Sequence, residues 1–307
     1  MRPARWLACL AAAAAGFGLP LPLPDNASVA ILCPVHQTNA RRTARLLGIL
    51  LALDVERKTC LVALLCDAHS AALVASDAGF PALEEAYGEV ALIADVASID
   101  VSGAAPGARE ARHEHARQWR RRARLAVARN SLVSAARINR FRWTLWLDSD
   151  LWAMPHDLLR RLFAPRAHVV APRVVDRGGV LYDKNSWAHT TSSRAAFYGL
   201  PASALVVQGG YRAQATFVVE DGGRLRAGAA FAVRSLDDLR GEASTRFVDL
   251  DAVGTACLLV ATSVYAAGVT FAEALDDHLL ESEAFGARAK RAGASVVADV
   301  ETVVQHA

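Results

Sequence analysis

The feature that most constrains the fold is an uninterrupted apolar run that ends on two acidic residues. Residues 143–155 read WTLWLDSDLWAMP, and no polar side chain alternates with the apolar ones from Thr144 to Leu147. Such a run predicts a β-strand buried on both faces, as in the centre of a parallel sheet. Asp148 and Asp150 would then lie at the carboxyl end of a central strand, the edge that faces the ligand crevice in open α/β sheets.

The spacing of these two acids favours a metal site. Two carboxylates held close together repel each other unless a cation neutralises them. A solvated turn is the alternative interpretation, because Asp and Ser are common in turns. The buried strand in front of Asp148 favours the metal site over the turn.

The rest of the chain alternates strand-like and helix-like segments. Strands are predicted at 29–35, 59–70 and 167–175, helices at 38–53, around 81–87 and along 112–130, and a hairpin at 211–233 around a D-G-G turn. Residues 177–194, RGGVLYDKNSWAHTTSSR, read as one long polar and aromatic loop that binds a ligand. Strands that alternate with helices predict an α/β fold with a mainly parallel central sheet flanked by helices.

The first 27 residues predict a signal peptide or a signal-anchor leader. Arg2 and Arg5 precede an apolar stretch that runs to about residue 23, and prolines at 20, 22 and 24 make its last part a poor helix. We expect residues 28–307 to form a single domain.

Charge and cysteine content narrow the function classes. The formal net charge is only +3, so bulk electrostatics do not indicate a nucleic-acid partner. Seven arginines nevertheless fall within 112–130, where a solvated face, a diphosphate-facing patch and an RNA-binding helix are alternatives. A buried stripe is expected on the same helix, at Trp119, Ala123, Ala126, Asn130 and Val133. The five cysteines contain no C-x-x-C pair, which argues against a structural zinc site but allows free thiols or a disulfide.

Three groups of motifs together resemble a known family. They are ARNSLVSAA (128–136) with the 143–155 run, YDKNSWAHT (182–190), and DLDAVGTACLLV (249–260) with ESEAFGARAKRAGASVV (281–297). In order and spacing, residues 28 to 306 resemble the fungal Golgi mannan-polymerase α-mannosyltransferases, glycosyltransferase family 62.

The resemblance implies a GT-A-like, nucleotide-sugar-binding fold and a retaining transfer of mannose. It also implies GDP-mannose as donor, a glycan acceptor, Mn²⁺ or another divalent cation, other glycosyltransferase subunits as partners, and a type II Golgi membrane location. By position, it assigns the metal to Asp148, Asp150 and His306, and catalysis to Asp251 and Glu283. It assigns the nucleotide sugar to Asp67, Arg129, Asn130, Asp148, Asn185 and Trp187.

The chain departs from the family pattern at two places. Val253-Gly254-Thr255 stands where the family has a double glycine, and Gln305 replaces the tryptophan before the late histidine. Taken without the resemblance, His306 reads as a frayed terminal residue.

Two carboxylates and an imidazole would leave open positions on a cation for a diphosphate, whose developing charge the cation would stabilise. A catalytically weak or inactive subunit of a glycosyltransferase complex is the alternative function. A sugar nucleotidyltransferase fits less well, because CPVHQTNARR after the first strand contains no glycine. An RNA-binding role ranks last.

Overall fold

The structure is a computed structural model that describes Leu19 and residues 28–36, 38–94, 115–200, 204–208, 214–221 and 224–307. Apart from Leu19, the predicted leader therefore lies outside the described residues. Within the described part of the chain, no helix is both long enough and apolar enough to cross a membrane.

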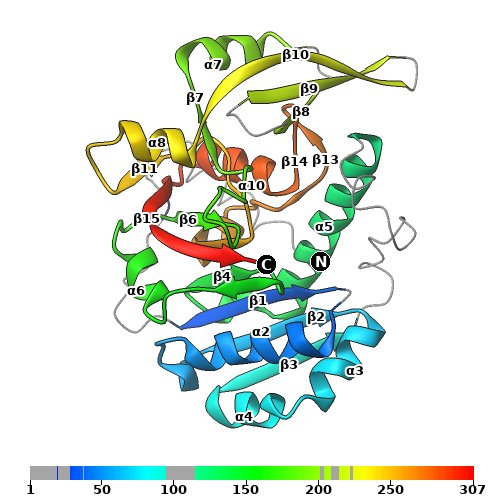
Figure 1. Cartoon of the computed structure of the whole chain (residues 1–307), viewed down its shortest axis with the longest axis vertical. Helices are drawn as coiled ribbons and strands as arrows, with labels where there is room; N and C mark the ends of the chain where they lie inside the picture. The colour runs from blue at the N-terminus through cyan, green and yellow to red at the C-terminus, as the bar shows by residue number, and fades with distance from the viewer. Residues whose placement is uncertain are drawn as a thin grey trace, which may run out of the picture.

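One half of the central sheet consists of parallel strands that bury both faces. β1 (Val29–Val35) pairs with β2 (Leu61–Cys66) on one side and with β4 (Trp143–Leu147) on the other, and β3 (Glu89–Ala94) extends the sheet beyond β2. Every residue of β2 and β4 is buried. The apolar runs thus form central strands as the sequence predicts, and Figure 1 shows them in the lower half of the molecule.

The other half of the sheet mixes directions. β12 (Cys257–Ala261) runs antiparallel between β4 and β6 (Val169–Val175), and β15 (Val296–His306) runs parallel to β6. β11 (Phe247–Asp249) and β5 (Leu151–Ala153) both pair antiparallel with β15. The strands β1 to β4, β6 and β15 therefore share one direction, which confirms the predicted α/β class with a mainly parallel central sheet.

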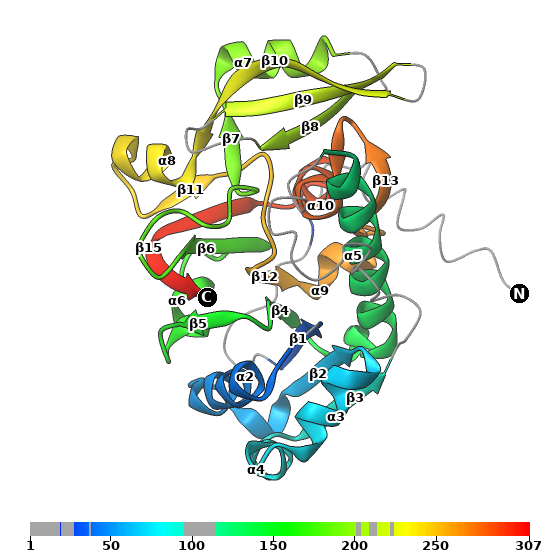
Figure 2. The same cartoon turned by 45° about the vertical axis from the view of Figure 1, so that its right-hand side comes forward.

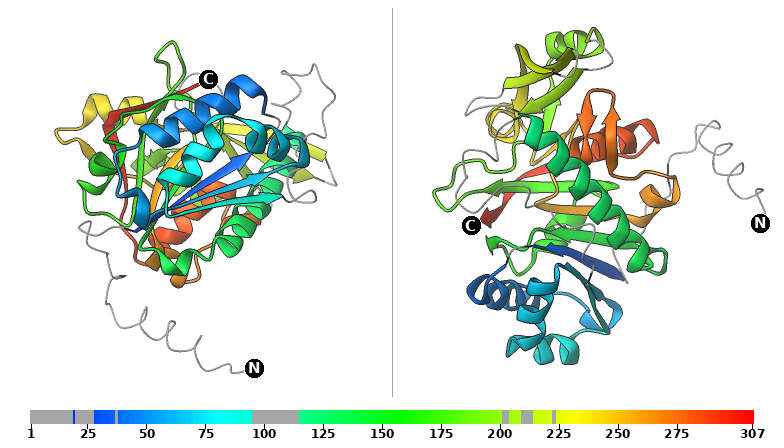
Figure 3. Two further views of the ribbon diagram at one scale, coloured as in Figure 1. Left: turned by 90° about the horizontal axis from the view of Figure 1, so that it is seen from below. Right: turned by 90° about the vertical axis from the view of Figure 1, so that its right-hand side faces the viewer.

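Helices cover this sheet. The sheet lies between α5 on one side and α2 and α3 on the other (Figure 3). Their bounds, with those of the remaining helices that pack near the central sheet, are α2 (Ala40–Ala52), α3 (Ala68–Ser76), α4 (Gly79–Ala86), α5 (His115–Ala135), α6 (Leu158–Phe163), α9 (Thr262–Ala266), α10 (Glu281–Arg291) and the short 3-10 turns Arg57–Thr59 and Ile138–Arg140.

A second sheet lies beyond the central one (Figure 2). Its order is β7 (Trp187–His189), β10 (Arg224–Ser235), β9 (Gln214–Asp221) and β8 (Ala204–Gln208). β9 and β10 form the predicted hairpin, whose turn lies outside the described residues. α7 (Thr191–Tyr198), α8 (Leu236–Glu242) and the small hairpin of β13 (Ala272–Asp276) and β14 (Leu279–Leu280) complete the architecture.

The sequence predicted one long loop at 177–194, and this prediction was wrong. The segment contains β7, which pairs antiparallel with β10, and it contains the start of α7. Thr190 caps that helix by accepting from the Ser193 N–H at 3.0 Å, while the Ser193 hydroxyl accepts from the Thr190 N–H. This reciprocal cap is a helix-start signal that the polar composition of the segment concealed.

The helix α5 buries a different stripe from the expected one. Ala126 is buried as predicted, but Ala123, Asn130 and Val133 are only half-buried, and the side chain of Trp119 lies outside the described residues. Arg122 and Arg129 occupy the buried face instead, at 5% and 4% exposure. The periodicity was correct, but the face was displaced because buried glutamates on α10 receive these arginines.

Cys33, Cys60, Cys66 and Cys257 are free and buried, so the free-thiol alternative holds for these four.

Candidate metal centre

The two aspartates after β4 sit in a tight turn that leads into β5. The N–H of Asp148 donates to the Ala256 carbonyl at 2.9 Å, so the backbone here is fixed by the β12 edge of the sheet. The carbonyl of Asp150 accepts from the N–H of Ala307 at 2.9 Å. These backbone bonds hold both carboxylates at the carboxyl end of a buried strand, as the sequence predicted.

His306 reaches this turn from the far end of the chain. It is the last residue of β15 and is 3% exposed, so it is not a frayed terminus. Its Nε2 lies 2.8 Å from Oδ1 of Asp150. One ligand atom from each of Asp148, Asp150 and His306 lies within 4.8 Å of the others. The structure therefore brings together the three residues predicted to bind a metal.

The two carboxyl groups of the cluster have pKa values shifted in opposite directions. Burial, opposed by the charge of Arg129 and reinforced by Asp150, raises the pKa of Asp148 to about 6. Burial would also raise the pKa of Asp150. The hydrogen bond from His306 and the charge of His306 outweigh burial, and the pKa of Asp150 lies below its usual range. Burial would lower the pKa of His306, yet the bond to Asp150 and the charges of both aspartates raise it. A cation would offset both the burial of Asp148 and its repulsion by Asp150, the two effects that raise the Asp148 pKa.

The cluster fits a divalent cation by its donor set. Two carboxylates and one imidazole are acceptable to Mn²⁺, whereas Mg²⁺ prefers oxygen ligands alone. Asp148 and Asp150 are half-buried, with side-chain exposures of 30% and 36%, so the site is open on one side. A bound cation could therefore also contact a ligand from solution.

Tyr182 belongs to the predicted binding loop, but the sequence did not assign it to the metal cluster. Its ring stacks on the His306 imidazole, with centroids 3.6 Å apart and planes 13° from parallel. At 46% exposure it covers the histidine on the solvent side. Its place at the start of the YDKNSWAHT motif was the signal available in the sequence. The sequence could not show that its partner is His306, which is distant along the chain.

Asp183 is a second missed residue. It is 7% exposed, and burial raises its pKa even though it accepts from the N–H groups of Asn185, at 3.1 Å, and Ala256. A Cβ at position 254 would lie 1.8 Å from its Oδ2, so only glycine allows this approach. Within Val253-Gly254-Thr255, the packing of Asp183 thus requires glycine at position 254.

A network of buried ion pairs connects Asp148 with arginines of α5 and glutamates of α10. Arg129 lies 3.3 Å from Oδ1 of Asp148 and also pairs with Glu281, which sits at φ 51° although it is not a glycine. Arg122 pairs with Glu283, and the indole N–H of Trp187 donates to the same carboxylate at 2.9 Å. Arg129 therefore contacts Asp148 directly. Glu283 and Trp187 contact each other and Arg122, and so lie one ion pair further from the two aspartates.

The remaining predicted residues lie in separate contacts. Asp251 accepts from Arg194 at 3.1 Å, from Lys290 at 2.7 Å and from the His189 N–H at 2.8 Å. These contacts hold its pKa low against the effect of burial.

Two predicted donor-binding residues make local bonds. Asp67 caps α3 by accepting from the Ser70 N–H at 2.8 Å, and lies 3.3 Å from Nδ1 of His36 at the end of the adjacent strand. The side chain of Asn130 donates to the Phe271 carbonyl and accepts from its N–H, both at 3.0 Å. Asn130 thus fastens α5 to β13 and the residue before it, and its hydrogen bonds go to Phe271 and Glu273 and not to the metal cluster.

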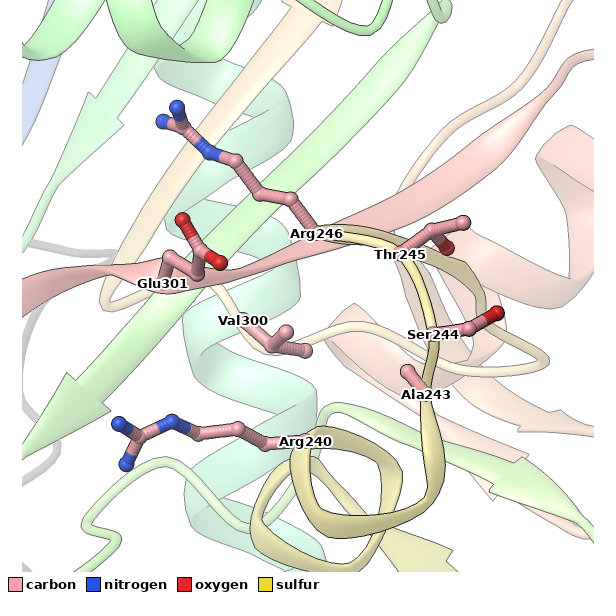
Figure 4. Close-up of a pocket in the computed structure, with 7 residues that line it drawn as sticks. All are labelled: Arg240, Ala243, Ser244, Thr245, Arg246, Val300 and Glu301. Carbon is pink, nitrogen blue, oxygen red and sulfur yellow. The ribbon is translucent and has the colours of Figure 1, made fainter.

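A pocket of about 440 Å³ lies elsewhere, between α8 and β15 (Figure 4). The guanidinium of Arg246, which faces it, is bound by both oxygens of Asp299 at 2.8 and 2.7 Å. The lining contains no predicted site residue and consists of Arg240, Ala243, Ser244, Thr245, Arg246, Val300 and Glu301.

Comparisons with known proteins agree with this geometry. A family model described as Anp1 matches residues 22–274. The mannan polymerase complex subunit mnn9 of Schizosaccharomyces pombe is 29% identical over 188 residues, covering 60% of this chain and 52% of the relative. The corresponding subunit MNN9 of Candida albicans is 31% identical over 194 residues, covering 60% and 49%. The chain spans about half the length of these curated relatives.

The fold is similar to that of a solved glycosyltransferase. A crystal structure of GalNAc-T7 with UDP, GalNAc and Mn²⁺ superposes with a TM-score of 0.50 at 10% identity, covering 92% of this chain and 44% of that one. At this identity the likeness concerns the fold alone, and it confirms the GT-A-like architecture.

Proposed function

We propose that this chain, which belongs to the Anp1 family, is a metal-dependent retaining glycosyltransferase that transfers mannose from GDP-mannose to a glycan. The convergence of Asp148, Asp150 and His306 at the carboxyl edge of the sheet carries the proposal. The names of the relatives, subunits of a mannan polymerase, support mannose as the transferred sugar. In this proposal residues 28–307 form one catalytic domain.

Mn²⁺ or another divalent cation would be held by Asp148, Asp150 and His306. When bound, it supplies positive charge for the departing diphosphate. The protein's own contribution is to hold the ligands in place: the Ala256 carbonyl, just before β12, fixes the backbone of Asp148, and the ring of Tyr182 shields one face of His306 from solvent. Arg129 lies 3.3 Å from Asp148 and orients that carboxylate.

The donor would lie over the carboxyl ends of β1, β2 and β4. Asp67 follows β2 and Asp148 follows β4, so both face the same edge of the sheet. Asn185 lies two residues from the buried Asp183, on the segment that also carries Tyr182. We assign Asp67, Arg129, Asn130, Asp148, Asn185 and Trp187 to the donor subsite as part of this proposal.

Asp251 and Glu283 are the proposed catalytic acids. Both are anionic partners of basic groups, Asp251 of Arg194 and Lys290, and Glu283 of Arg122. Glu283 is fully buried, which favours an action through Arg122 over direct contact with the sugar. Asp251 is partly exposed and is the better placed of the two for contact with a ligand.

The proposed cellular setting draws on the same relatives and on the predicted leader. Because those proteins are named as subunits of complexes, other glycosyltransferase subunits are the proposed partners. A Golgi membrane location with a lumenal catalytic domain would use the leader at residues 1–27 as its anchor or targeting signal.

Transfer and hydrolysis assays with a panel of nucleotide sugars test the function. We expect activity with GDP-mannose and Mn²⁺, and loss of that activity with EDTA. Calorimetry supplies an independent readout, since GDP should bind with Mn²⁺ and only weakly without it. GDP binding of equal affinity in EDTA would contradict the metal bridge, and turnover of another nucleotide sugar alone would contradict the donor.

A catalytically weak or inactive subunit is the second candidate. The observation that favours it is that the relatives are named as parts of a complex. In that case the isolated chain should bind GDP and Mn²⁺ but transfer no sugar until a partner subunit is added. The Asp150→Asn variant then separates the two roles: in a supporting subunit, it should leave the activity of the reconstituted complex unchanged.

A further inference from the structure

A tryptophan beside the metal cluster is held between two arginines. Trp152 lies in β5, two residues after Asp150. The Cζ atom of Arg45, from α2, lies 3.7 Å from its ring centroid, and that of Arg177, from the loop after β6, lies 4.0 Å away. Two guanidinium groups this close to one ring cannot share a face without clashing, so they lie on opposite faces. The negative faces of the ring stabilise both cations.

Two further arginines extend this positive surface. Arg41 and Arg42 are exposed in the first turn of α2, which contains no acidic residue. Burial, followed by the charges of Arg41, Arg177 and Arg42, lowers the pKa of Arg45, so the other three cations act on Arg45. We call these four arginines and Trp152 the arginine surface.

The carboxylates near the arginine surface make their hydrogen bonds elsewhere. Among the described residues, none of the four arginines forms an ion pair with a carboxylate. The nearby Asp176 accepts from the N–H groups of Gly178 and Val180 in its own loop, at 2.8 and 3.0 Å. The charge of Arg42 acts on Asp150, which His306 already contacts. Cations gathered at the start of a helix also oppose the helix dipole, so this arrangement costs stability.

We propose that Arg41, Arg42, Arg45 and Arg177, with Arg45 and Arg177 stacked on Trp152, form a phosphate-binding surface next to the metal cluster. Guanidinium groups bind phosphate oxygens through two parallel N–H bonds, and a ring that fixes their planes prepares them for this geometry. Four cations match a group that carries two or more negative charges better than they match a single carboxylate.

Two sources could supply the phosphate. One is the diphosphate of the nucleotide sugar, which would extend from the metal past Asp150. The other is a phosphate ester on the glycan acceptor. Naming these sources rests on the proposed function, but phosphate binding itself does not, and it can be measured with the metal removed.

Calorimetric titration with inorganic pyrophosphate in EDTA tests the arginine surface directly. We expect the double variant Arg45→Gln/Arg177→Gln to bind pyrophosphate roughly 10- to 100-fold more weakly, since hydrogen bonds to charged groups are stronger than those between neutral groups. The control is Arg160→Gln/Arg240→Gln, which removes the same charge from exposed positions on α6 and α8 and should bind as the unmodified chain does. Circular dichroism confirms that each variant is folded.

A third variant separates geometry from charge. Trp152→Leu keeps all four arginines but removes the ring that orients two of them. We expect it to lose most of the affinity that the double variant loses. An equal loss in the control variant, or unchanged pyrophosphate affinity in the double variant, would overturn the proposal. Binding of an acidic peptide with no measurable binding of pyrophosphate would overturn it too, and would point to a protein partner.

Titration with GDP and with mannose 6-phosphate then identifies the source. If the donor supplies the phosphate, the double variant should raise the KM for GDP-mannose and bind GDP weakly, with mannose 6-phosphate unaffected. If the acceptor supplies it, mannose 6-phosphate binding should fall and GDP binding should not. Failure of the proposed function would appear as absent transfer with pyrophosphate binding intact, which is distinct from failure of this surface.

Discussion

Two pairs of acidic residues assigned to the site have opposite surroundings in this protein. Asp148 and Asp150 end a buried strand, remain half-open to solvent and have His306 and Arg129 as their basic neighbours. Asp251 and Glu283 instead form ion pairs, Asp251 with Arg194 and Lys290 and Glu283 with Arg122. The first group has ligand atoms that converge on one point. In the second, basic side chains occupy the carboxylate oxygens.

The difference shows how to read acidic residues in a fold of this kind. An acid whose partners come from the protein mainly stabilises the arrangement of elements, because removing one partner leaves an uncompensated charge. An acid that shares its space with another acid gains from a cation supplied by solution. The predictions below test whether the two groups differ in this way.

The largest expected effect is the loss of transfer in Asp150→Asn. The amide is nearly isosteric but lacks the charge that a divalent cation needs, so activity should fall by more than about 100-fold, beyond the range seen for groups that only support a metal ligand. The melting temperature should stay close to that of the unmodified chain. Asp249→Asn, at an exposed position, is the matched control. Gross unfolding of Asp150→Asn would mean that this acid belongs with the structural group.

Glu283→Gln should act on stability first. It leaves the buried Arg122 without its closest counter-charge, and breaking a buried ion pair costs about 3–5 kcal/mol. Denaturant unfolding measures this loss. Glu89→Gln is the control, because it breaks an exposed pair with Arg140 and should cost about 1 kcal/mol or less. A Glu283→Gln protein of normal stability with a reduced kcat would instead support direct catalysis by this acid.

His306→Ala should weaken the metal site while leaving the fold in place. We expect Mn²⁺ affinity to fall by about 10- to 100-fold or more, since even groups behind the ligands can contribute that much. Deleting Ala307 alone removes one backbone bond to Asp150 and should have little effect. Tyr182→Leu, which removes the ring stacked on the imidazole, should give an intermediate loss. Equal Mn²⁺ affinity in His306→Ala and the unmodified chain would show that the two aspartates bind the cation without His306.

The smallest expected effect is a pH dependence of stability near Asp251. Burial lowers the pKa of His189 to about 4, from 6.5. Between these values the unfolded chain binds a proton that the folded chain does not, so stability should decline as pH falls through this window. Melting temperatures at pH 7 and pH 5 measure the decline. His189→Gln cannot titrate and should show a smaller difference, whereas an unchanged difference would assign the effect to other groups.

Much of the fold was predictable from the sequence, for local reasons. Apolar runs without alternation marked β1, β2 and β4 as central strands, and the motifs predicted the family that the Anp1 match over residues 22–274 confirms. The α5 stripe and the segment 177–194 were misjudged, because Arg122 and Arg129 look like surface residues and Thr190 like a loop residue until their partners are known.

By itself, then, the sequence determined where the strands lie and that two acids end one of them, since periodicity and strand-end chemistry depend on neighbours along the chain. Only the tertiary structure decided which charges meet. Arg122 and Glu283 are 161 residues apart, and His306 reaches Asp150 because β15 runs parallel to β6 and then pairs with β5. Whether a carboxylate is neutralised by an arginine or left for a cation depends on such distant contacts, because electrostatic energy follows separation in space and not along the sequence.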